Sequence, residues 1–224
     1  MKPALEWLAE SSHACLIYQN PDQQMAVVSQ FLKIGLERDE QCVLLEMPEK
    51  LAMARLALKG LGVDTAAAEA RKALILTAKR DFLDRGRFDG PRAIDFLMQA
   101  SADAIEQGFN ALRITGDMNW ELGADQDFRL LIDYEANLDD FLTGQKIVGM
   151  CQYQRYSVSS LAICNALETH ESVILGDRFC AENFYYEPPD VRLEKDPARR
   201  EQRRGEWMCG QLSRAIASDD LHVA

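Results

Sequence analysis

The sequence predicts an α/β fold in which a mostly parallel sheet lies between two layers of helices. Five short apolar runs of strand length alternate along the chain with amphipathic stretches of helix length. The runs QCVLLE and ALILT show almost no polar alternation, which is typical of parallel strands buried on both faces. A chain of 224 residues, of which 47% are hydrophobic and 27% charged, can bury a sizeable core. We therefore expect one three-layer sandwich followed by a tail.

The first half of the chain contributes three strands and three helices to this prediction. The first helix carries its apolar residues on one stripe, and Asn20-Pro21-Asp22 supplies a turn and a cap at its start. Gly60 and Gly62 close the second helix. Residues 78–89 are charged and aromatic without a clean period, so we expect a mobile loop or a short helix over one edge of the sheet. The expected strands are residues 14–18, 41–46 and 73–77, and the expected helices are residues 22–38, 49–59 and 65–71.

The second half adds two more strands, three helices and a terminal hairpin. The fourth strand is expected to break at Gly116, and the hairpin is expected to turn at Gly176-Asp177. The hairpin would place an antiparallel strand at one edge of the sheet. The expected strands are residues 109–115 and 147–152, the helices are residues 91–107, 126–142 and 157–168, and the hairpin strands are residues 172–175 and 178–180.

The core domain is expected to span residues 1–190, because Pro188-Pro189 stops regular structure there. Residues 191–224 form the tail, and within it 192–218 reads as an amphipathic helix that docks on the core or on a partner. The net charge of −11 disfavours nucleic acid and anionic lipid surfaces. Basic residues cluster only between Arg192 and Arg214, with seven bases against four acids. The helix carries its apolar side chains at roughly helical spacing, namely Trp207, Met208, Leu212 and Ile216.

Neither a disulfide framework nor a metal site of standard spacing is visible. The six cysteines form no CxxC pair, and most lie in apolar runs where a thiol behaves as a small hydrophobe. No apolar stretch is long enough for a membrane helix, and the N-terminus lacks the features of a signal peptide. We therefore expect a cytoplasmic protein with no metal, and His13 and His170 are expected to be core or capping residues.

The residues that follow the predicted strands identify a candidate ligand site. In an open parallel sheet, ligands bind outside the carboxyl ends of the strands. Aromatic and methionine side chains there would form the walls of a pocket, and amide and carboxyl groups would orient a small, weakly polar molecule. The candidate ligand-binding residues are Tyr18, Asn20, Glu46, Met47, Asp117, Met118, Asn119, Trp120, Gln152 and Tyr153.

A catalytic function is not expected. The loop QNPDQQ after the first strand lacks the glycines and the lysine of a phosphate-binding loop, and Asp22 places a negative charge there. Glu46 and Asp117 could bind a cation or act as a general base, but hydrogen bonding to loop backbone is the simpler role. No GxSxG elbow, HExxH pair or Cys/His nucleophile constellation is present.

Five segments occur in a characteristic order along the chain, namely HACLIYQNPDQQMAVVSQFLKIGLERDEQCVLLE, ALRITGDMNWEL, LIDYEANLDDFL, VGMCQYQRYSVSSLA and ETHESVILGDRFCAENFYYEPP. Together they resemble one family, the MEDS (methanogen/methylotroph DcmR sensory) domains. The resemblance covers residues 13 to about 190 and implies a RecA/KaiC-like core with a degenerate phosphate loop, in agreement with QNPDQQ. It also implies a signal-input module for small hydrocarbon-derived molecules, of the kind joined to histidine kinases or DNA-binding regulators. This chain ends soon after the domain, so its output is expected to be a protein partner.

We therefore predict a non-catalytic sensory module that binds a small molecule and signals to a regulatory partner, such as a histidine kinase or a transcription regulator, as a homodimer. No cofactor can be named from the sequence. Two alternatives remain open. One is a nucleotide-binding protein or enzyme derived from the ATPase core. The other is a dimerising adaptor with a vestigial pocket, whose function lies in the tail.

Overall fold

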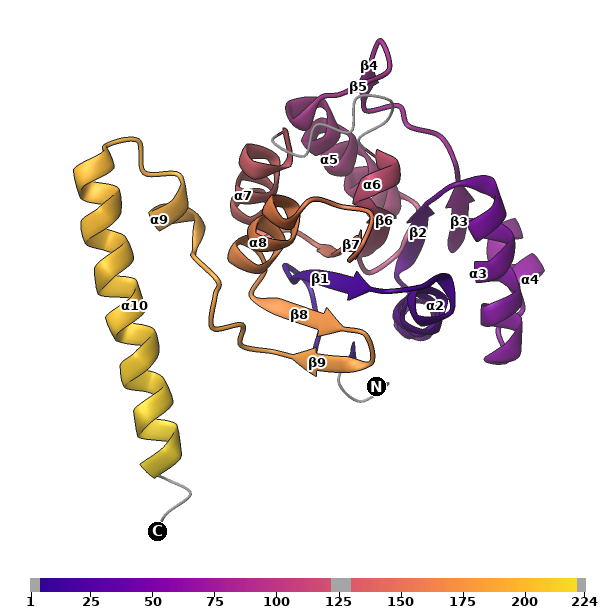
Figure 1. Ribbon diagram of the computed structural model, residues 1–224. Coiled ribbons are helices and arrows are strands. Elements are labelled where there is room, and N and C mark those ends of the chain that lie inside the picture. Colours follow the sequence, from indigo (N-terminus) through magenta and orange to yellow (C-terminus); the bar gives the residue numbers. More distant parts are fainter. Residues whose placement is uncertain (1–4, 122–129, 221–224) are drawn as a thin grey trace.

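In a computed structural model that describes residues 5–121 and 130–220, the chain forms the expected three-layer α/β sandwich (Figure 1). Its strands are β1 (His13–Tyr18), β2 (Gln41–Leu45), β3 (Leu74–Thr77), β6 (Leu112–Asp117), β7 (Ile147–Gln154), β8 (Ser172–Leu175) and β9 (Arg178–Cys180). They form one sheet in the order β3-β2-β6-β7-β1-β8-β9. All neighbouring strands pair in parallel except β8 and β9, which form an antiparallel hairpin at the edge. The predicted mostly parallel sheet with an antiparallel edge is confirmed.

Helices cover both faces of this sheet, because its strands are too apolar for either face to remain in water. One face, here called the α2 face, is covered by α2 (Pro21–Glu37), α3 (Pro48–Gly60) and α4 (Thr65–Ala70). The opposite α7 face is covered by α5 (Gly90–Glu106), α7 (Leu130–Leu142) and α8 (Ser160–Thr169). The short helix α6 (Met118–Glu121) directly follows β6.

Successive residues of each strand alternate between the two cores, as the pleat of a β-strand requires. In β7, Met150 packs in the core of the α2 face, whereas Cys151 and Tyr153 pack in the core of the α7 face. In β2, Leu44 and Leu45 separate in the same way. A position along a strand therefore fixes the face on which a side chain acts.

Residues 78–89 form no helix, and the predicted loop is interrupted by two short strands that the sequence did not indicate. The strands β4 (Leu83–Asp84) and β5 (Arg87–Phe88) form a small hairpin. Arg85 and Gly86 both have positive φ, at 48° and 83°, which is the conformation that a two-residue hairpin turn needs. Phe82 and Phe88 are buried in the core of the α7 face, and their packing stabilises the hairpin. The charged residues around them obscure the strand pattern in the sequence.

The predicted break of the fourth strand at Gly116 is wrong. Strand β6 continues through Gly116 to Asp117, and Gly116 pairs with both Leu45 and Cys151. A glycine with a strand on each side is held in the ladder by both neighbours. Helix boundaries differ less: α8 begins at Ser160, where the Ser159 hydroxyl caps it, and part of the predicted helix 126–142 lies outside the described residues.

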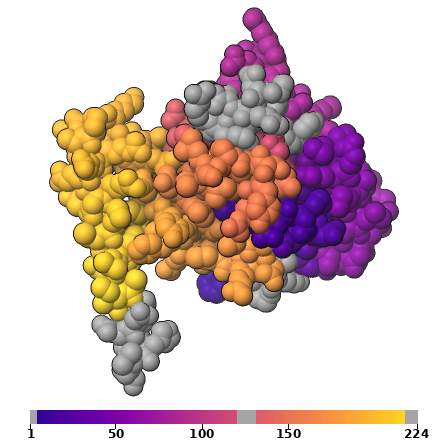
Figure 2. All heavy atoms as spheres, viewed as in Figure 1, coloured from indigo at the N-terminus to yellow at the C-terminus, as the bar shows by residue number. Residues whose placement is uncertain are grey.

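The chain leaves the sandwich through α9 (Pro189–Arg192) and ends in the long helix α10 (Pro197–Asp220) beside the body of the domain (Figure 1). Trp207 anchors this helix, because its indole Nε1 donates to the Tyr186 carbonyl oxygen at 2.8 Å. Figure 2 shows part of α10 projecting beyond the rest of the molecule. Within the described chain, no helix has the length and apolar character needed to cross a membrane.

Candidate functional site

A buried polar cluster lies at the carboxyl ends of four strands on the α2 face. Its centre is Lys50, whose ammonium group lies 2.8 Å from Asp117 Oδ2 and 3.2 Å from Glu46 Oε2. The Tyr18 hydroxyl donates to the same Asp117 oxygen, and Lys50 Nζ lies 3.1 Å from that hydroxyl. Both carboxylates are almost completely buried. We call the set the rim cluster, and its members are Tyr18, Gln24, Glu46, Lys50, Asp117 and Gln152.

Two glutamines extend the rim cluster into the sheet. The Gln24 amide nitrogen donates to Glu46 Oε2 at 2.8 Å and to Gln152 Oε1 at 2.7 Å. The Gln152 amide nitrogen in turn donates to the Thr115 hydroxyl at 2.7 Å, and that hydroxyl donates to the Met150 carbonyl oxygen at 2.6 Å. These bonds tie α2 to the end of β2 and to β6 and β7, whereas Gln24 Oε1 has no hydrogen-bond partner among the described residues.

In the rim cluster two carboxyl groups, Glu46 and Asp117, interact with one ammonium group, that of Lys50. Burial raises the pKa of Glu46 above its ordinary value, and the negative charge of Asp117 raises it further, while Lys50 opposes both. Burial and the Asp117 charge also raise the pKa of the Tyr18 hydroxyl, which therefore remains a proton donor. A lysine ammonium thus lies between the carboxylates that sequence reasoning considered as cation ligands.

Sequence reasoning placed Tyr18, Glu46, Asp117 and Gln152 at one rim, and the structure brings these four together. It missed Gln24 and Lys50, because both lie one turn into a helix and not at a strand end. A signal existed for Lys50, which is four residues after Glu46 and can form an i,i+4 ion pair.

The remaining predicted residues lie elsewhere. Asn20 caps α2, with its side-chain oxygen accepting from the Gln23 amide at 3.0 Å. Met47 is the residue before α3, and its backbone N–H donates to Glu46. The Asn119 backbone N–H donates to Asp117 Oδ1 at 2.9 Å. The side chain of Trp120 lies outside the described residues, so its predicted place beside the pocket stays a prediction.

Met118 and Tyr153 belong to the α7 face, so the ten predicted residues do not line a single pocket. The correction follows from the pleat: Tyr153 follows Gln152 in β7 and must point to the opposite face. Its hydroxyl donates to the Glu135 carboxylate on α7. Grouping residues by strand end alone ignores this alternation.

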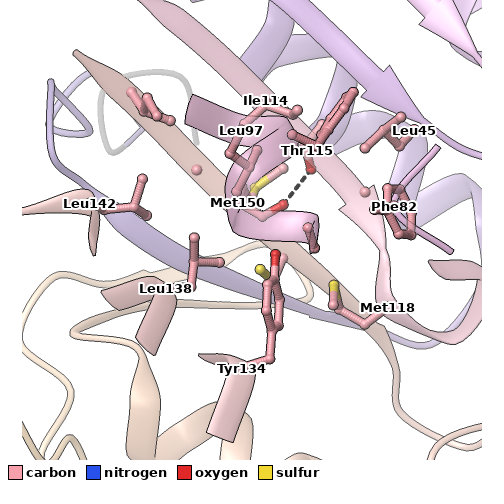
Figure 3. Close-up of a pocket in the computed structure, with 16 residues that line it drawn as sticks. Leu45, Phe82, Leu97, Ile114, Thr115, Met118, Tyr134, Leu138, Leu142 and Met150 are labelled. Atoms are coloured by element: carbon pink, nitrogen blue, oxygen red, sulfur yellow. Dashed lines mark hydrogen bonds between the residues drawn. The ribbon is translucent and has the colours of Figure 1, made fainter. Parts of the chain in front are cut away.

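Met118 instead lines an apolar cavity between the sheet and helices α5 and α7 (Figure 3). No charged side chain is found in its lining among the residues that the structure describes. The Tyr134 side chain points into the ring of lining residues, and the Thr115 hydroxyl is held by its bond to the Met150 carbonyl (Figure 3). The labelled lining residues are Leu45, Phe82, Leu97, Ile114, Thr115, Met118, Tyr134, Leu138, Leu142 and Met150.

Both histidines singled out in the sequence are buried on the α7 face, with ring centroids 3.9 Å apart and ring planes tilted by 43°. Burial opposes a charge on His13, but hydrogen bonds with Asp139 and Glu135 outweigh it and raise the pKa of His13 to about 9. Burial and the neighbouring His13 lower the pKa of His170 to about 4. Asp139 and Glu135 both lie on α7, so the histidines tie β1 and the end of α8 to that helix.

The model of the MEDS family, described as the methanogen/methylotroph, DcmR sensory domain, matches residues 12–171. The chain belongs to the MEDS family. The matched residues run from the start of β1 to the start of β8 and include the rim cluster, the lining of the apolar cavity and both core histidines.

This MEDS domain has two informative relatives. It is 28% identical over 165 residues to the transcriptional repressor DcmR of Methylorubrum extorquens, covering 73% of this chain and 60% of the repressor. In structure it is similar to a KaiC-like protein of Pyrococcus horikoshii, with a TM-score of 0.50 at 14% identity over 74% of this chain and 72% of that protein. The first similarity supports a sensory and regulatory role, and the second shows the KaiC-like, RecA-type fold.

The loop QNPDQQ, which lacks the glycines and the lysine of a phosphate-binding loop, has a different role in this MEDS domain. The loop between β1 and α2, where RecA-type folds bind phosphate, holds Asn20 as a side-chain cap, not a cradle of backbone N–H groups. The next helical turn turns Gln24 inward to hydrogen-bond with Glu46 and Gln152. The loop is thus occupied by interactions within the chain.

Proposed function

We propose that this chain is a non-catalytic sensory domain whose ligand, a small and weakly polar molecule, binds in the apolar cavity on the α7 face. The observation that carries the proposal is the cavity itself, enclosed by β2, β6, β7, α5 and α7 and lined by aliphatic, aromatic and methionine side chains (Figure 3). Ligand sites are concave and mainly apolar, with few polar groups. The MEDS membership supports a sensory role for such a site.

The size of the cavity supports a ligand of only a few non-hydrogen atoms. Its volume is about 40 Å³, whereas one water needs about 10–15 Å³ on the same measure. A nucleotide is far too large and too highly charged for this space. A hydrocarbon derivative with one hydroxyl, carbonyl or similar group would match the mainly apolar walls of this cavity.

The rim cluster supports the absence of catalysis. Lys50 forms ion pairs with Glu46 and Asp117, and the raised pKa of Glu46 favours the neutral form of that acid, so the pair needs no metal ion for neutralisation. Tyr18 and Gln24 occupy further lone pairs of the same groups. A network whose members are bound to one another is suited to holding four strands in register, and poorly suited to binding substrate.

We propose that helix α10 relays the signal to a regulatory protein partner, with a homodimer of this chain as the functional unit. Met208, Leu212 and Ile216 are spaced four residues apart and therefore lie along one side of α10, and each is more than half exposed. An exposed apolar stripe on a helix is the type of surface that docks in a groove of another protein. The repressor relative supports an output in gene regulation.

The cavity proposal can be tested with simple probes. Xenon should raise the melting temperature, and so should small alcohols, ketones and nitriles of up to four carbons, because a ligand that binds only the native state stabilises it. Ala93 lines the cavity, so Ala93→Leu should fill it and remove the effect of the probes. Ala102→Leu, on the exposed side of the same helix, is the matched control. Equal stabilisation of Ala93→Leu and the control would place the ligand elsewhere.

A further inference from the structure

Four buried side chains with metal-ligating atoms converge on one point of the α7 face. They come from the start of β1, the middle of α7, the middle of β7 and the residue after α8. Their ligating atoms all lie within 4.8 Å of one another, and all four residues are buried. We call the set the core tetrad, and it consists of His13, Glu135, Cys151 and His170.

Four of the six distances within the core tetrad match the edges of a tetrahedron around a metal ion, and all six are within 4.8 Å. His13 Nε2 lies 3.3 Å from Glu135 Oε2 and 3.7 Å from Cys151 Sγ. Glu135 Oε2 lies 3.6 Å from both Cys151 Sγ and His170 Nε2. For Zn²⁺, with bonds of about 2.0–2.1 Å to nitrogen and oxygen and about 2.3 Å to sulfur, tetrahedral edges measure about 3.3–3.7 Å.

The surroundings of the tetrad orient both imidazoles so that Nε2 is the ligating atom. His13 Nδ1 lies 3.2 Å from Asp139 Oδ1, a carboxylate-histidine arrangement that typically supports metal-bound histidine. His170 Nδ1 lies 2.8 Å from the Ala166 carbonyl oxygen and must carry the proton that bonds to it. The Tyr153 hydroxyl donates to Glu135 Oε1, which leaves Oε2 directed at the tetrad.

One atom of the tetrad lacks a partner. His170 Nε2 is completely buried and has no hydrogen-bond partner among the described residues. Because its Nδ1 donates to Ala166, this nitrogen presents a lone pair to the centre of the tetrad. An unsatisfied acceptor in a core costs free energy that a bound cation would recover.

We propose that the core tetrad is a structural Zn²⁺ site with His13 Nε2, Glu135 Oε2, Cys151 Sγ and His170 Nε2 as the four ligands. Two neutral imidazoles, one thiolate and one carboxylate give this site a charge of −2, which complements a divalent ion. Thiolate and imidazole together favour zinc over magnesium or calcium. Four protein ligands around a buried ion leave no open position, so the metal joins β1, α7, β7 and the end of α8 and activates no water.

Cobalt substitution gives a direct test of this site. The full-length chain is unfolded in the presence of a chelator, freed of metal and refolded with Co²⁺. We expect one ion per chain, with the intense visible bands of tetrahedral cobalt and a thiolate-to-cobalt charge-transfer band in the near ultraviolet. Zn²⁺ should displace cobalt and abolish these bands. A wild-type chain that refolds and yields none of these signals overturns the proposal.

Variants identify the ligands. Cys151→Ser should remove the charge-transfer band, whereas Cys42→Ser, which changes a buried strand cysteine on the α2 face, should retain it. Asp139→Asn acts on a positioning residue and should lower zinc affinity by about 10–100-fold while keeping the tetrahedral bands. If Cys151→Ser fails to fold, His170→Gln is examined with Co²⁺ instead, and the loss of this ligand should weaken the visible bands of tetrahedral cobalt. A Cys151→Ser protein with an unchanged cobalt spectrum would show that the ion binds elsewhere.

The zinc site and the cavity can be tested separately, although Cys151 also lines the cavity. Cobalt spectra report on the tetrad alone, and xenon stabilisation of Ala93→Leu reports on the cavity alone. Without metal, His13 would instead be held as a cation between Glu135 and Asp139. Wild-type protein that retains the same melting temperature with chelator, zinc or neither would establish that metal-free arrangement and overturn the proposal.

Discussion

Gln152 and Tyr153 are neighbours in β7, yet their side chains hydrogen-bond on opposite faces of the sheet. The Gln152 side-chain oxygen accepts from Gln24 within the rim cluster, and the Tyr153 hydroxyl donates to Glu135 of the core tetrad. One strand therefore contributes to both polar networks of this MEDS domain and, through Cys151, to the cavity between them. Each network can be perturbed separately by choosing the face of the substituted residue.

Replacing Lys50 by methionine should destabilise the fold by about 3 kcal/mol at neutral pH. The substitution leaves Glu46 and Asp117 buried without a counter-ion, and breaking a buried ion pair in this way costs several kcal/mol. Urea unfolding measures the loss. Lys33→Met removes a half-exposed pair with Glu37 and should cost at most about 1 kcal/mol. Equal effects of the two substitutions would argue against a central role for Lys50.

Glu46 should make stability depend on pH in a predictable direction. Its pKa is raised in the folded state, mainly by burial, so the native protein holds a proton that the unfolded chain releases. The stability gained from this proton is complete below the ordinary pKa of glutamate and is lost as pH rises through the folded value. The free energy of unfolding, compared between wild type and Glu46→Gln from pH 4 to 8, should therefore favour wild type most at the acidic end. Glu49→Gln, on the exposed first turn of α3, is the control, and a difference that grows with pH would contradict the assignment.

Magnesium-ATP should neither stabilise the protein nor be hydrolysed by it. The loop after β1 offers no glycine or lysine to the phosphates, and Lys50 lies between the two carboxylates that a metal would need. Thermal unfolding with and without magnesium-ATP, together with a phosphate-release assay, checks both statements. Magnesium-dependent turnover that Glu46→Gln abolishes would instead favour an enzyme derived from the ATPase core.

Gly35 should not tolerate a side chain. A Cβ at this position of α2 would lie 2.5 Å from Arg113 Cδ and 2.6 Å from Cys42 Sγ. Arg113 cannot move away easily, because it is fully buried between Phe31 and Glu40. Gly35→Ala should therefore lower the free energy of unfolding by about 1–3 kcal/mol. Gly60→Ala has open space around its Cβ and should be neutral or slightly stabilising, and equal outcomes would refute the packing argument.

The sequence was most informative about strands, because a run of apolar residues indicates a buried strand whatever the rest of the fold. Buried apolar runs located five strands of the sheet, the turn at Gly176-Asp177 located the hairpin of β8 and β9, and the carboxyl-end rule located Tyr18, Glu46, Asp117 and Gln152 at one rim. It was least informative where a contact depends on helix rotation. Gln24 reaches the rim only because α2 turns its side chain toward the sheet, and no local spacing encodes that rotation. The i,i+4 spacing of Lys50 from Glu46 indicates their ion pair, but not the second contact of Lys50 with Asp117.

The core tetrad shows the same limit more strongly. Metal sites visible in sequence have ligands a few residues apart, but His13 and Cys151 are separated by 138 residues. Glu135 is further concealed within a helix whose inward residues are mostly apolar. Only the pairing of β1 with β7 brings these groups together, and a single sequence does not reveal that pairing.

The strand order has a consequence for how the protein is made. Strand β1 leaves the ribosome first, but its two neighbours in the sheet, β7 and β8, are translated near the end of the domain. At about 5–20 residues per second, roughly 7 to 30 seconds separate the synthesis of His13 from that of Cys151. Throughout that interval both edges of β1 are unpaired and open to other nascent chains. The sheet cannot be completed before β7 and β8 have been synthesised, so cellular chaperones that shield β1 should affect the yield of this protein more than its final stability.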